Sequence, residues 1–567
     1  MLRPLVSVCV VLALASAAVN DAHKDTRSDK TDKTDKTESL SASSDGSSSH
    51  SSNATPSRSS DTSRSLSPST LPEFITVPLS IPSDDIYYNA YVTDDAGTSI
   101  GVRVDLVQPD VWFLNGAVLP NCSTLNSSAS IGSAGCYVGD AFTPTTSAPS
   151  SSTYNIPYPN GISAQGSPYT ANLTIGGVGG HLALDDFGFV LASSTNMHSG
   201  GLGLAPHPYA SGLLDVLVSE GLVAGHGYSI YFGGKRNGTS GSLLLGAVDK
   251  SFYSGSLYQY PPVAYTGWDD NGDQRALPIV MLDKIILYNS VTRRQATLYG
   301  NESIPVLLDS RYGYSYLPLD TVIQLAVQTN AYYSSKSNRW IVKCSDIEDS
   351  HATVNLTFGP LNVPVPLTSL LVDAMMDNNY LYFSSGDRAC FLNVLPNTRL
   401  GYTALGLPFI TQMYLVMDND GGHVGIANKN EDVDLDYDLD DDAKAFKGNA
   451  SKLSVGNFST NVSAQYIHSG TIPFATPVTY SENRTLTFAP SNITNTELIP
   501  SRFSAVIIQS GEIYITVPDS YTEKNSSSTP ASTSKSDGMA IAYSSRNLSP
   551  IFWAILLAGL SLGICLS

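Results

Sequence analysis

Charged residues are scarce in this chain, and most of those it has are acidic. Asp, Glu, Lys and Arg make up 14% of its 567 residues, and the formal net charge is −19. A nucleic-acid-binding surface needs clustered basic residues to replace counterions, so this balance argues against a nucleic-acid partner. Gly, Ser, Thr and Tyr are abundant instead, which favours β-strands joined by turns over long helices.

Uninterrupted apolar runs are found at the two ends of the chain. The run over residues 5–14 follows Arg3, is too short to span a bilayer and precedes small residues. These features predict a secretory signal peptide over residues 1–17. A buried core helix is the alternative interpretation of the same run.

The C-terminal apolar run, residues 551–566, has no basic residue after it. A polar spacer precedes it, and small residues such as Gly538 lie upstream. This order predicts a glycosylphosphatidylinositol (GPI) attachment signal over residues 537–567, and therefore a surface protein held to the plasma membrane, or the cell wall, through a lipid. A single transmembrane anchor is the alternative, although it normally carries basic residues on its cytoplasmic side.

Cysteine is also rare, and two of the six cysteines, Cys9 and Cys565, lie in the segments expected to be removed. The four that remain are Cys122, Cys136, Cys344 and Cys390. An even number in a secreted chain predicts two disulfides, with three pairings open; the pairs that are adjacent in sequence close the shortest loops. A metal site would need histidines at ligand spacing nearby, and none is present, so we expect neither a metal nor a cofactor.

The chain changes character along its length. Residues 18–72 are so polar that they cannot offset their ordering entropy, which predicts a linker, a glycosylated stalk or a propeptide. From Phe74 to about residue 430, short apolar runs alternate with turn residues, as in all-β proteins, and helix-like segments occur only at places such as 211–218 and 319–328.

An acidic and glycosylated C-terminal extension is expected over residues 431–536. It begins with an acidic run, 431–442, that lacks the spacing and the glycine of a calcium loop and so resembles a solvated linker. Weak strand patterns follow, which leaves open a small β appendage or an extended stalk. Glycosylation sequons occur throughout the expected mature chain, for example at Asn121, Asn172, Asn301, Asn355 and Asn461.

The body contains an internal repeat. Asp105 ends one apolar strand and Asp309 ends another, and an apolar–Gly–apolar triplet follows each at nearly equal spacing, around Gly203 and Gly406. This duplication predicts two homologous lobes, residues 73–265 and 266–430, which each present one aspartate at the seam between them. A single aspartate at a strand end would more often be a turn residue.

Two carboxylates at such a seam can perform chemistry. Within hydrogen-bonding distance they cannot both ionise cheaply, so one keeps a proton. The pair can then activate a water as a general base and protonate a scissile carbonyl as a general acid.

Several segments in this order resemble the pepsin-like aspartic proteases, and within them the surface-anchored yapsins. The segments are Asp-Leu-Val-Gln-Pro-Asp-Val-Trp (105–112), Ile-Pro-Tyr-Pro-Asn-Gly (156–161), Gly-Ser-Leu-Leu-Leu-Gly-Ala-Val-Asp (241–249), Leu-Asp-Ser-Arg-Tyr (308–312) and the late Leu-Gly segment (402–409). The resemblance implies an all-β, bilobal fold with pseudo-two-fold lobes, flanked by disordered or stalk-like extensions. It implies catalytic Asp105 and Asp309, and a polypeptide ligand in the interlobe cleft.

The resemblance also assigns supporting residues. Tyr158 occupies the position of the flap tyrosine, while Trp112 and Ser310 complete the substrate-binding set. Cys344 and Cys390 occupy the positions of the second lobe's disulfide.

Both Asp-Thr/Ser-Gly motifs are altered. Leu106 lacks the hydroxyl that bonds across the seam, Val107 and Arg311 replace the two glycines, and Gln108 and Tyr312 replace small hydroxyl residues. A long or β-branched side chain at a glycine position is expected to disturb close backbone packing. A guanidinium close to the pair would favour two ionised carboxylates and remove the proton that catalysis needs, unless Arg311 turns outward.

Two functions follow from these residues. One is an aspartic endopeptidase that hydrolyses peptide bonds at the cell surface. The other is an inactive pseudoprotease that keeps the cleft for peptide or protein binding, or serves as a structural cell-wall component. Yapsin-like precursors are typically processed at basic pairs, and none occurs between the signal and Phe74.

Overall fold

The computed structural model describes residues 74–82, 86–122, 136–145, 152–177, 180–206, 212–233, 240–268, 276–376, 379–433, 435, 463–482, 484–490, 499 and 506–515. The expected signal peptide, the polar segment 18–72, most of the acidic run and the expected anchor signal lie outside these residues. A search of the described ranges found no helix with the length and apolarity needed to cross a membrane.

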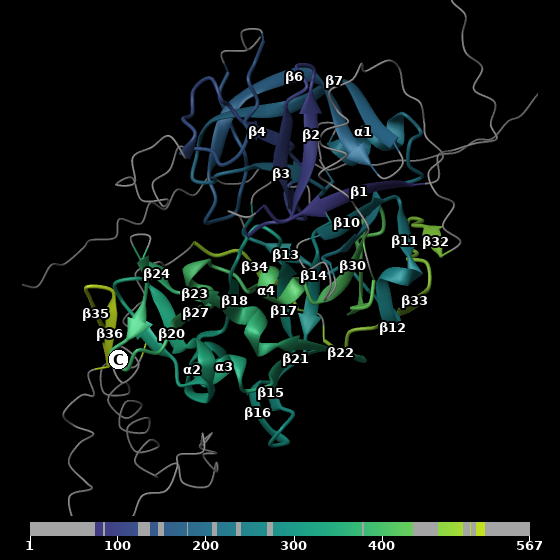
Figure 1. Cartoon of the computed structure of the whole chain (residues 1–567). Coiled ribbons are helices and arrows are strands. Elements are labelled where there is room, and N and C mark those ends of the chain that lie inside the picture. Colours follow the sequence, from purple (N-terminus) through teal and green to yellow (C-terminus); the bar gives the residue numbers. More distant parts are fainter. Residues whose placement is uncertain are drawn as a thin grey trace, which may run out of the picture. The chain divides into compact units, whose positions relative to one another are not determined.

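The all-β fold expected from the sequence is confirmed, and its main element is a sheet of 14 strands. In spatial order these are β33 (Ala475–Pro477), β12 (Tyr253–Tyr260), β31 (His423–Lys429), β30 (Met413–Asp418), β9 (Gly227–Tyr231), β10 (Ser240–Leu245), β1 (Ile75–Ser80), β2 (Asn89–Asp94), β3 (Ser99–Asp105), β8 (Gly200–Gly203), β4 (Trp112–Leu114), β7 (Gly180–Thr195), β6 (Ala164–Gly177) and β5 (Tyr154–Asn155). Strands of both sequence halves take part, because β30 pairs with β9 and β31 pairs with β12. Figure 1 labels β12 of the first half and β30 of the second. This sheet therefore joins the two halves across the boundary expected near residue 265.

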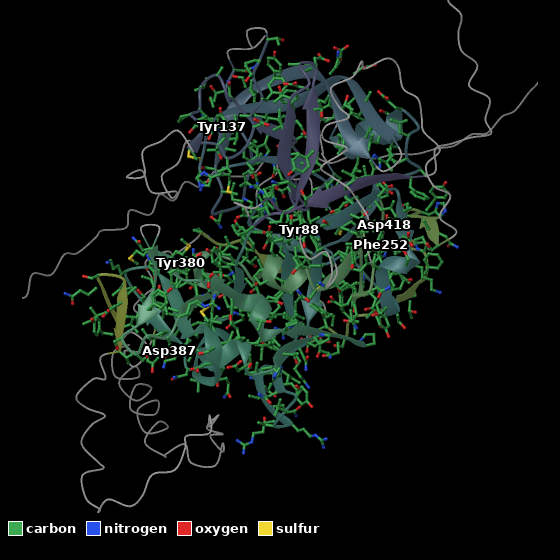
Figure 2. The ribbon with its side chains drawn as sticks, viewed as in Figure 1. Tyr88, Tyr137, Phe252, Tyr380, Asp387 and Asp418 are labelled. Carbon is green, nitrogen blue, oxygen red and sulfur yellow. A yellow bond between two sulfur atoms is a disulfide. The ribbon has the colours of Figure 1, made fainter. Side chains whose placement is uncertain are left out.

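Alternating burial shows why these segments form strands. In β1, Ile75, Val77 and Leu79 are buried while the residues between them are partly exposed. Such a period of two places one face of a strand in the core. Tyr88, which is labelled in Figure 2, leads into β2 and is only 4% exposed. It donates its hydroxyl hydrogen to the carbonyl oxygen of Phe232. The buried aromatic residues thus tie the strands to the adjoining loops.

The second half adds three sheets of four or five strands, among smaller ones described below. One contains β14 (Ile279–Leu282), β17 (Ile304–Leu308), β29 (Ala404–Leu405), β18 (Ser315–Leu317) and β28 (Val394–Pro396). The second contains β16 (Arg294–Tyr299), β15 (Lys284–Asn289), β21 (Ala352–Phe358) and β22 (Leu361–Pro366). The third contains β19 (Tyr332–Ser334), β20 (Arg339–Lys343), β27 (Ala389–Leu392) and β23 (Leu371–Asp373). They build a continuous apolar core with the first half.

The helices are short, and the longer two lie where the sequence predicts them. The two longer α-helices are α1 (Leu213–Ser219) and α2 (Leu319–Thr329), and the two shorter ones are α3 (Cys344–Glu348) and α4 (Leu407–Ile410). In α2, Val322, Leu325 and Ala326 are buried at helical spacing, and Asn330 ends the helix in the left-handed conformation with φ of 52°.

The described part of the C-terminal extension forms strands that pair with the body. They are β32 (Ala464–Tyr466) on β11 (Ala247–Asp249), β33 on β12, β34 (Leu486–Thr487) on β13 (Tyr265–Thr266), and the hairpin of β35 (Val506–Gln509) and β36 (Glu512–Ile515) on β26 (Tyr382–Phe383). A further small hairpin joins β24 (Met375–Met376) and β25 (Asn379–Tyr380). Sequence left open a β appendage or a stalk for residues 431–536; the described strands of this segment pair with the body, and the rest of it lies outside the described residues.

Candidate functional site

The two repeated aspartates lie at equivalent positions of two similar strand pairs. In the first half β3 runs parallel to β8, and Asp105 stands opposite Gly203. In the second half β17 runs parallel to β29, and the main-chain N–H of Asp309 donates to the carbonyl of Leu405 at 2.9 Å. The duplication seen in the sequence therefore corresponds to duplicated geometry.

A close backbone approach explains the glycine of each repeated triplet. A Cβ atom on Gly203 would lie 2.6 Å from the carbonyl oxygens of Gln108 and Asp110. A Cβ atom on Gly406 would lie 2.0 Å from the carbonyl oxygen of Tyr314. Any side chain at these positions would collide with the loop that follows each aspartate. These glycines hold both loops against their sheets.

Ser310 joins the two aspartate loops across the seam. Its hydroxyl donates to the carbonyl oxygen of Val104 at 2.7 Å and accepts from the main-chain N–H of Leu106 at 3.1 Å. Leu106 has no hydroxyl, so the reciprocal pair of bonds cannot form. The seam therefore keeps one half of a symmetrical hydrogen-bond arrangement, all of it buried.

Arg311 binds the carboxylate of Asp309 with two parallel hydrogen bonds. Its Nε lies 2.8 Å from Oδ1 and its Nη2 lies 2.6 Å from Oδ2, and both side chains are fully buried. Burial, the largest influence, lowers the pKa of the Arg311 guanidinium, but the charge and hydrogen bonds of Asp309, together with the nearby Tyr402 and Tyr312, outweigh it and raise that pKa well above its ordinary value. Arg311 also donates to the hydroxyl of Tyr402 at 3.2 Å. The guanidinium is thus turned into the seam and remains charged.

Asp105 has a different set of partners. Its Oδ1 accepts main-chain N–H groups of Val107 and Gln108 at 3.1 and 3.0 Å. Its Oδ2 lies 3.8 Å from Nη2 of Arg103, and its Oδ1 lies 4.0 Å from Nε of Arg311. Both guanidiniums are fully buried, so the seam holds two carboxylates and two positive charges that balance them.

Arg103 was not among the residues that sequence reasoning singled out. A signal was present, because residues two apart on a strand share a face, and Arg103 precedes Asp105 by two in β3. Its guanidinium also lies over the rings of Tyr87 and Trp112, 5.4 and 5.9 Å from their centroids. Within the described part of the chain its N–H groups make no hydrogen bond. Aromatic faces and the Asp105 carboxylate therefore compensate its charge.

The loop between β5 and β6 closes over this seam. Tyr158 in that loop accepts a hydrogen bond from the indole N–H of Trp112 at 2.9 Å and donates to Oδ2 of Asp105 at 3.3 Å. Burial, and next the nearby Asp105 charge, raise the pKa of Tyr158 above its ordinary value, so its hydroxyl stays protonated. The residues that the family resemblance placed at the flap and beside it are brought together.

A second contact ties the same loop to the second half. The hydroxyl of Tyr312 donates to the carbonyl oxygen of Asn160 at 2.6 Å. Burial raises the pKa of Tyr312 well above its ordinary value, so it too remains a donor. Asp105 and Asp309 are both 0% exposed beneath this closed loop.

We expected the altered motifs to disturb the loops that follow the two aspartates, but they do not. Val107 is buried in the core, and its N–H still reaches Asp105, just as the N–H of Arg311 reaches Asp309 at 3.0 Å. Gln108 turns its side chain away from the pair and donates to Asp110 at 2.7 Å. The alternative in which Arg311 turns outward is not the arrangement in this structure.

The four cysteines form the two local pairs of the three pairings that the sequence allows. The sulfur atoms of Cys122 and Cys136 are 2.12 Å apart, and those of Cys344 and Cys390 are 2.07 Å apart. His198 lies near the first pair and Asp373 near the second. Because disulfide sulfur is not a thiolate, neither group offers the deprotonated cysteines that a zinc site uses.

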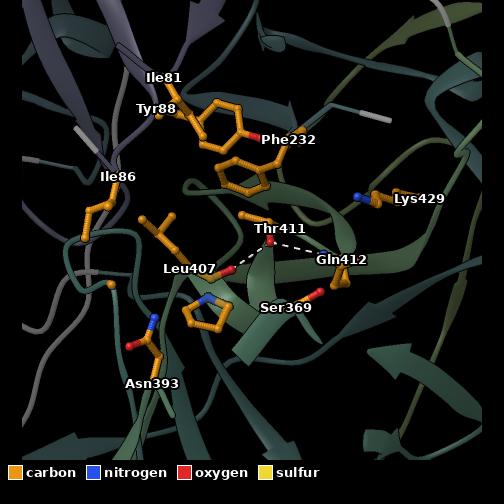
Figure 3. A pocket seen from close by; sticks show the side chains of 12 residues that line it. Ile81, Ile86, Tyr88, Phe232, Ser369, Asn393, Leu407, Thr411, Gln412 and Lys429 are labelled. Carbon is orange, nitrogen blue, oxygen red and sulfur yellow. Dashed lines mark hydrogen bonds between the residues drawn. The ribbon is translucent and has the colours of Figure 1, made fainter. Parts of the chain in front are cut away.

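A cavity of about 330 Å³ lies elsewhere between residues of the two halves (Figure 3). Its lining includes Tyr88, Phe232, Leu407 and Thr411, and neither aspartate of the seam is part of it. Thr411 uses its hydroxyl to donate to the carbonyl oxygen of Leu407 at 2.8 Å. The cavity is therefore separate from the dyad.

Comparison with known proteins identifies the family of this chain. The family model described as "Eukaryotic aspartyl protease" matches residues 100–429, which include both aspartates, and the chain belongs to this family. "Aspartic proteinase yapsin-7" of Saccharomyces cerevisiae is 31% identical over 289 residues, covering 49% of this chain and 46% of that protein. "Probable aspartic-type endopeptidase opsB" of Aspergillus fumigatus is 27% identical, covering 61% and 69%. "Barrierpepsin" of Saccharomyces cerevisiae is 28% identical, covering 61% of each chain.

The matched part spans from about half to about two thirds of the length of these curated relatives. A solved aspartic proteinase from Irpex lacteus, at 18% identity and a TM-score of 0.45, covers 63% of this chain and 97% of its own.

Proposed function

We propose that this chain is a catalytically inactive aspartic protease homologue whose interlobe cleft binds polypeptide without hydrolysing it. The observation that carries the proposal is the buried, bidentate Arg311–Asp309 ion pair. Peptide hydrolysis by an aspartate pair needs one carboxyl group protonated and the other ionised. A guanidinium that binds both oxygens of Asp309 occupies the positions where this carboxylate would exchange protons.

The charge balance of the seam supports the same conclusion. Two carboxylates close together normally retain one proton because they repel each other. Here Arg103 and Arg311 add two positive charges at 3.8 and 2.6 Å from Asp105 and Asp309. This compensation offsets the repulsion that makes such a pair of carboxylates share a proton.

The second candidate is an active endopeptidase, and specific observations favour it. Both aspartates, the Tyr158–Trp112 hydrogen bond and the cross-seam bonds of Ser310 are present. It would require Arg311 to leave Asp309 before each turnover. Breaking a buried, charge-assisted bidentate pair is strongly unfavourable, which is why we prefer the inactive assignment.

A cleavage assay on the secreted ectodomain distinguishes the two candidates. We expect no hydrolysis of unfolded protein between about pH 3 and 6, because Arg311 occupies both oxygens of Asp309. The measurement is mass spectrometry of products, with Asp309→Asn as the matched control for contaminating protease. Cleavage by the wild type that disappears in Asp309→Asn would overturn the proposal in favour of the endopeptidase.

We further propose that the protein is held at the cell surface by a GPI anchor. The apolar run 551–566 behind a polar spacer and small residues, the apolar run 5–14 and the many sequons support this location. We expect phosphatidylinositol-specific phospholipase C to release the protein from isolated membranes into the soluble fraction. Retention in the membrane after complete digestion, with a known GPI-anchored protein released in the same sample, would favour the transmembrane alternative.

A further inference from the structure

The C-terminal extension places a short strand beside the closed loop described above. Strand β34 pairs in parallel with β13, and the N–H of Phe488 then donates to the carbonyl of Thr266 at 2.8 Å. The next residue, Ala489, donates its N–H to the carbonyl of Gly401 at 3.0 Å. Its own carbonyl accepts from Nδ2 of Asn160 at 2.9 Å. The segment is therefore held between a strand, the second half and the flap-like loop.

Its side chains show the alternation of a bound extended peptide. Leu486 and Phe488 are 3% and 4% exposed, whereas Thr487 between them is exposed. Main-chain bonds to a strand edge combined with pockets for alternate side chains are the general mode of strand-addition recognition. The segment 486–489 meets both criteria.

Phe488 fills an aromatic pocket. Its ring centroid lies 5.8 Å from that of Tyr265, 5.3 Å from that of Trp268 and 4.6 Å from that of Tyr402, each in an edge-to-face arrangement. Such pairs add to the energy of burying an aromatic ring. The pocket therefore selects an aromatic side chain.

The backbone of the second half approaches the segment closely beside the pocket. Gly401 has φ of +94°, and a Cβ atom there would lie 1.9 Å from the carbonyl oxygen of Ala489. Only a glycine at position 401 lets the main chain of segment 486–489 come this close to the second half. The hydrogen bond from Asn160 to the same carbonyl closes the loop over it.

Tyr402 connects the aromatic pocket to the arginine that binds Asp309. Tyr402, which packs on Phe488, accepts a hydrogen bond from Nη2 of Arg311, the atom that also binds Asp309. An occupant of the aromatic pocket thus helps to hold Arg311 in its bidentate position.

We infer that the segment 486–489 is an internal ligand of the cleft. The groove that it fills binds, in trans, an extended polypeptide with an apolar residue and an aromatic residue two positions later, once the internal segment has left. This inference rests on the proposed function as a polypeptide-binding cleft. A tethered segment acts at an effective concentration on the order of millimolar, so it masks the groove from weaker ligands in solution.

A binding experiment on the full ectodomain tests this inference. The probe is a fluorescent peptide of residues 484–490, Arg-Thr-Leu-Thr-Phe-Ala-Pro. We expect Phe488→Ala to bind it about 100-fold more tightly than the wild type, because the internal competitor has lost its anchor. The same peptide with alanine in place of phenylalanine should bind neither protein.

The matched control is Phe474→Ala, which removes a phenylalanine of the same extension that is 38% exposed and outside the groove. It should leave peptide binding at the wild-type level. Folded Phe488→Ala that does not bind the peptide, or Phe474→Ala that binds it as well as Phe488→Ala does, would show that the segment is only a structural strut.

A second measurement needs no variant, in case Phe488→Ala fails to fold. In the wild type, the amides of Phe488 and Ala489 should exchange hydrogen through local opening, far faster than the amide of Ile230 in β9. Exchange of all three only with global unfolding would refute the inference. Mass spectrometry of the peptide in the same samples reports on the proposed function separately, because cleavage would contradict inactivity whether or not the groove binds.

Discussion

Replacing Asp309 by asparagine is expected to lower the free energy of unfolding by about 3–5 kcal/mol, because it leaves a buried guanidinium without its counter-charge. Arg311 and Asp309 are both 0% exposed, so solvent cannot take over the lost interaction. Asparagine keeps the size of the side chain and one acceptor oxygen, but it cannot balance the charge. Equilibrium unfolding in urea, followed by tryptophan fluorescence, measures the change.

Two controls separate the ion pair from general damage. The double variant Asp309→Asn/Arg311→Met removes both charges, so its loss should be clearly smaller than that of Asp309→Asn alone. Asp185→Asn changes an exposed carboxylate in β7 and should alter the unfolding free energy by less than about 0.5 kcal/mol. If Asp309→Asn were neutral or stabilising, the seam would behave as two repelling carboxylates, and the inactive assignment would lose its physical basis.

Trp112→Ala is expected to cost a similar amount, about 3–5 kcal/mol, for a different reason. The indole is fully buried and belongs to a cluster that includes Leu114, Ile156 and Val190. Its removal leaves a cavity below the flap-like loop and deprives Tyr158 of a donor. Thermal and urea unfolding of the purified ectodomain would report the loss.

Trp112→Phe is the matched variant, because it retains most of the buried ring and removes only the N–H donor. It should cost about 1 kcal/mol, the usual net value of one hydrogen bond, plus a smaller packing loss. Equal losses for the alanine and phenylalanine variants would mean that the hydrogen bond to Tyr158, and not ring burial, holds this region together.

Much of the architecture could be predicted from local pattern and spacing. The aspartates at strand ends, the two Gly-centred triplets and the two longer helices are all found where the sequence places them. Such features survive in a linear sequence because strand alternation, turn residues and helix periodicity act over a few neighbouring positions. The family assignment rests on the same short motifs.

The state of the candidate site was harder to predict. The sequence indicated that Arg311 could prevent catalysis by the two aspartates, but it left open whether the side chain points toward them or away. It gave no indication that was used for Arg103. Whether a guanidinium turns inward depends on which groups desolvate it and which carboxylate it meets. Tyr402 lies 91 positions from Arg311, and their hydrogen bond is not signalled by any local pattern.

By itself, the sequence determined that this protein has two related halves, each with one aspartate at the end of a buried strand, because that information is periodic and local. Only the tertiary structure placed Arg103 and Arg311 beside the two aspartates. It also placed the Tyr312 hydroxyl on the carbonyl of Asn160 and the Phe488 ring against Tyr402. These outcomes depend on side chains far apart in the chain. Packing brings those side chains together, and burial makes an unpaired charge strongly unfavourable in free energy.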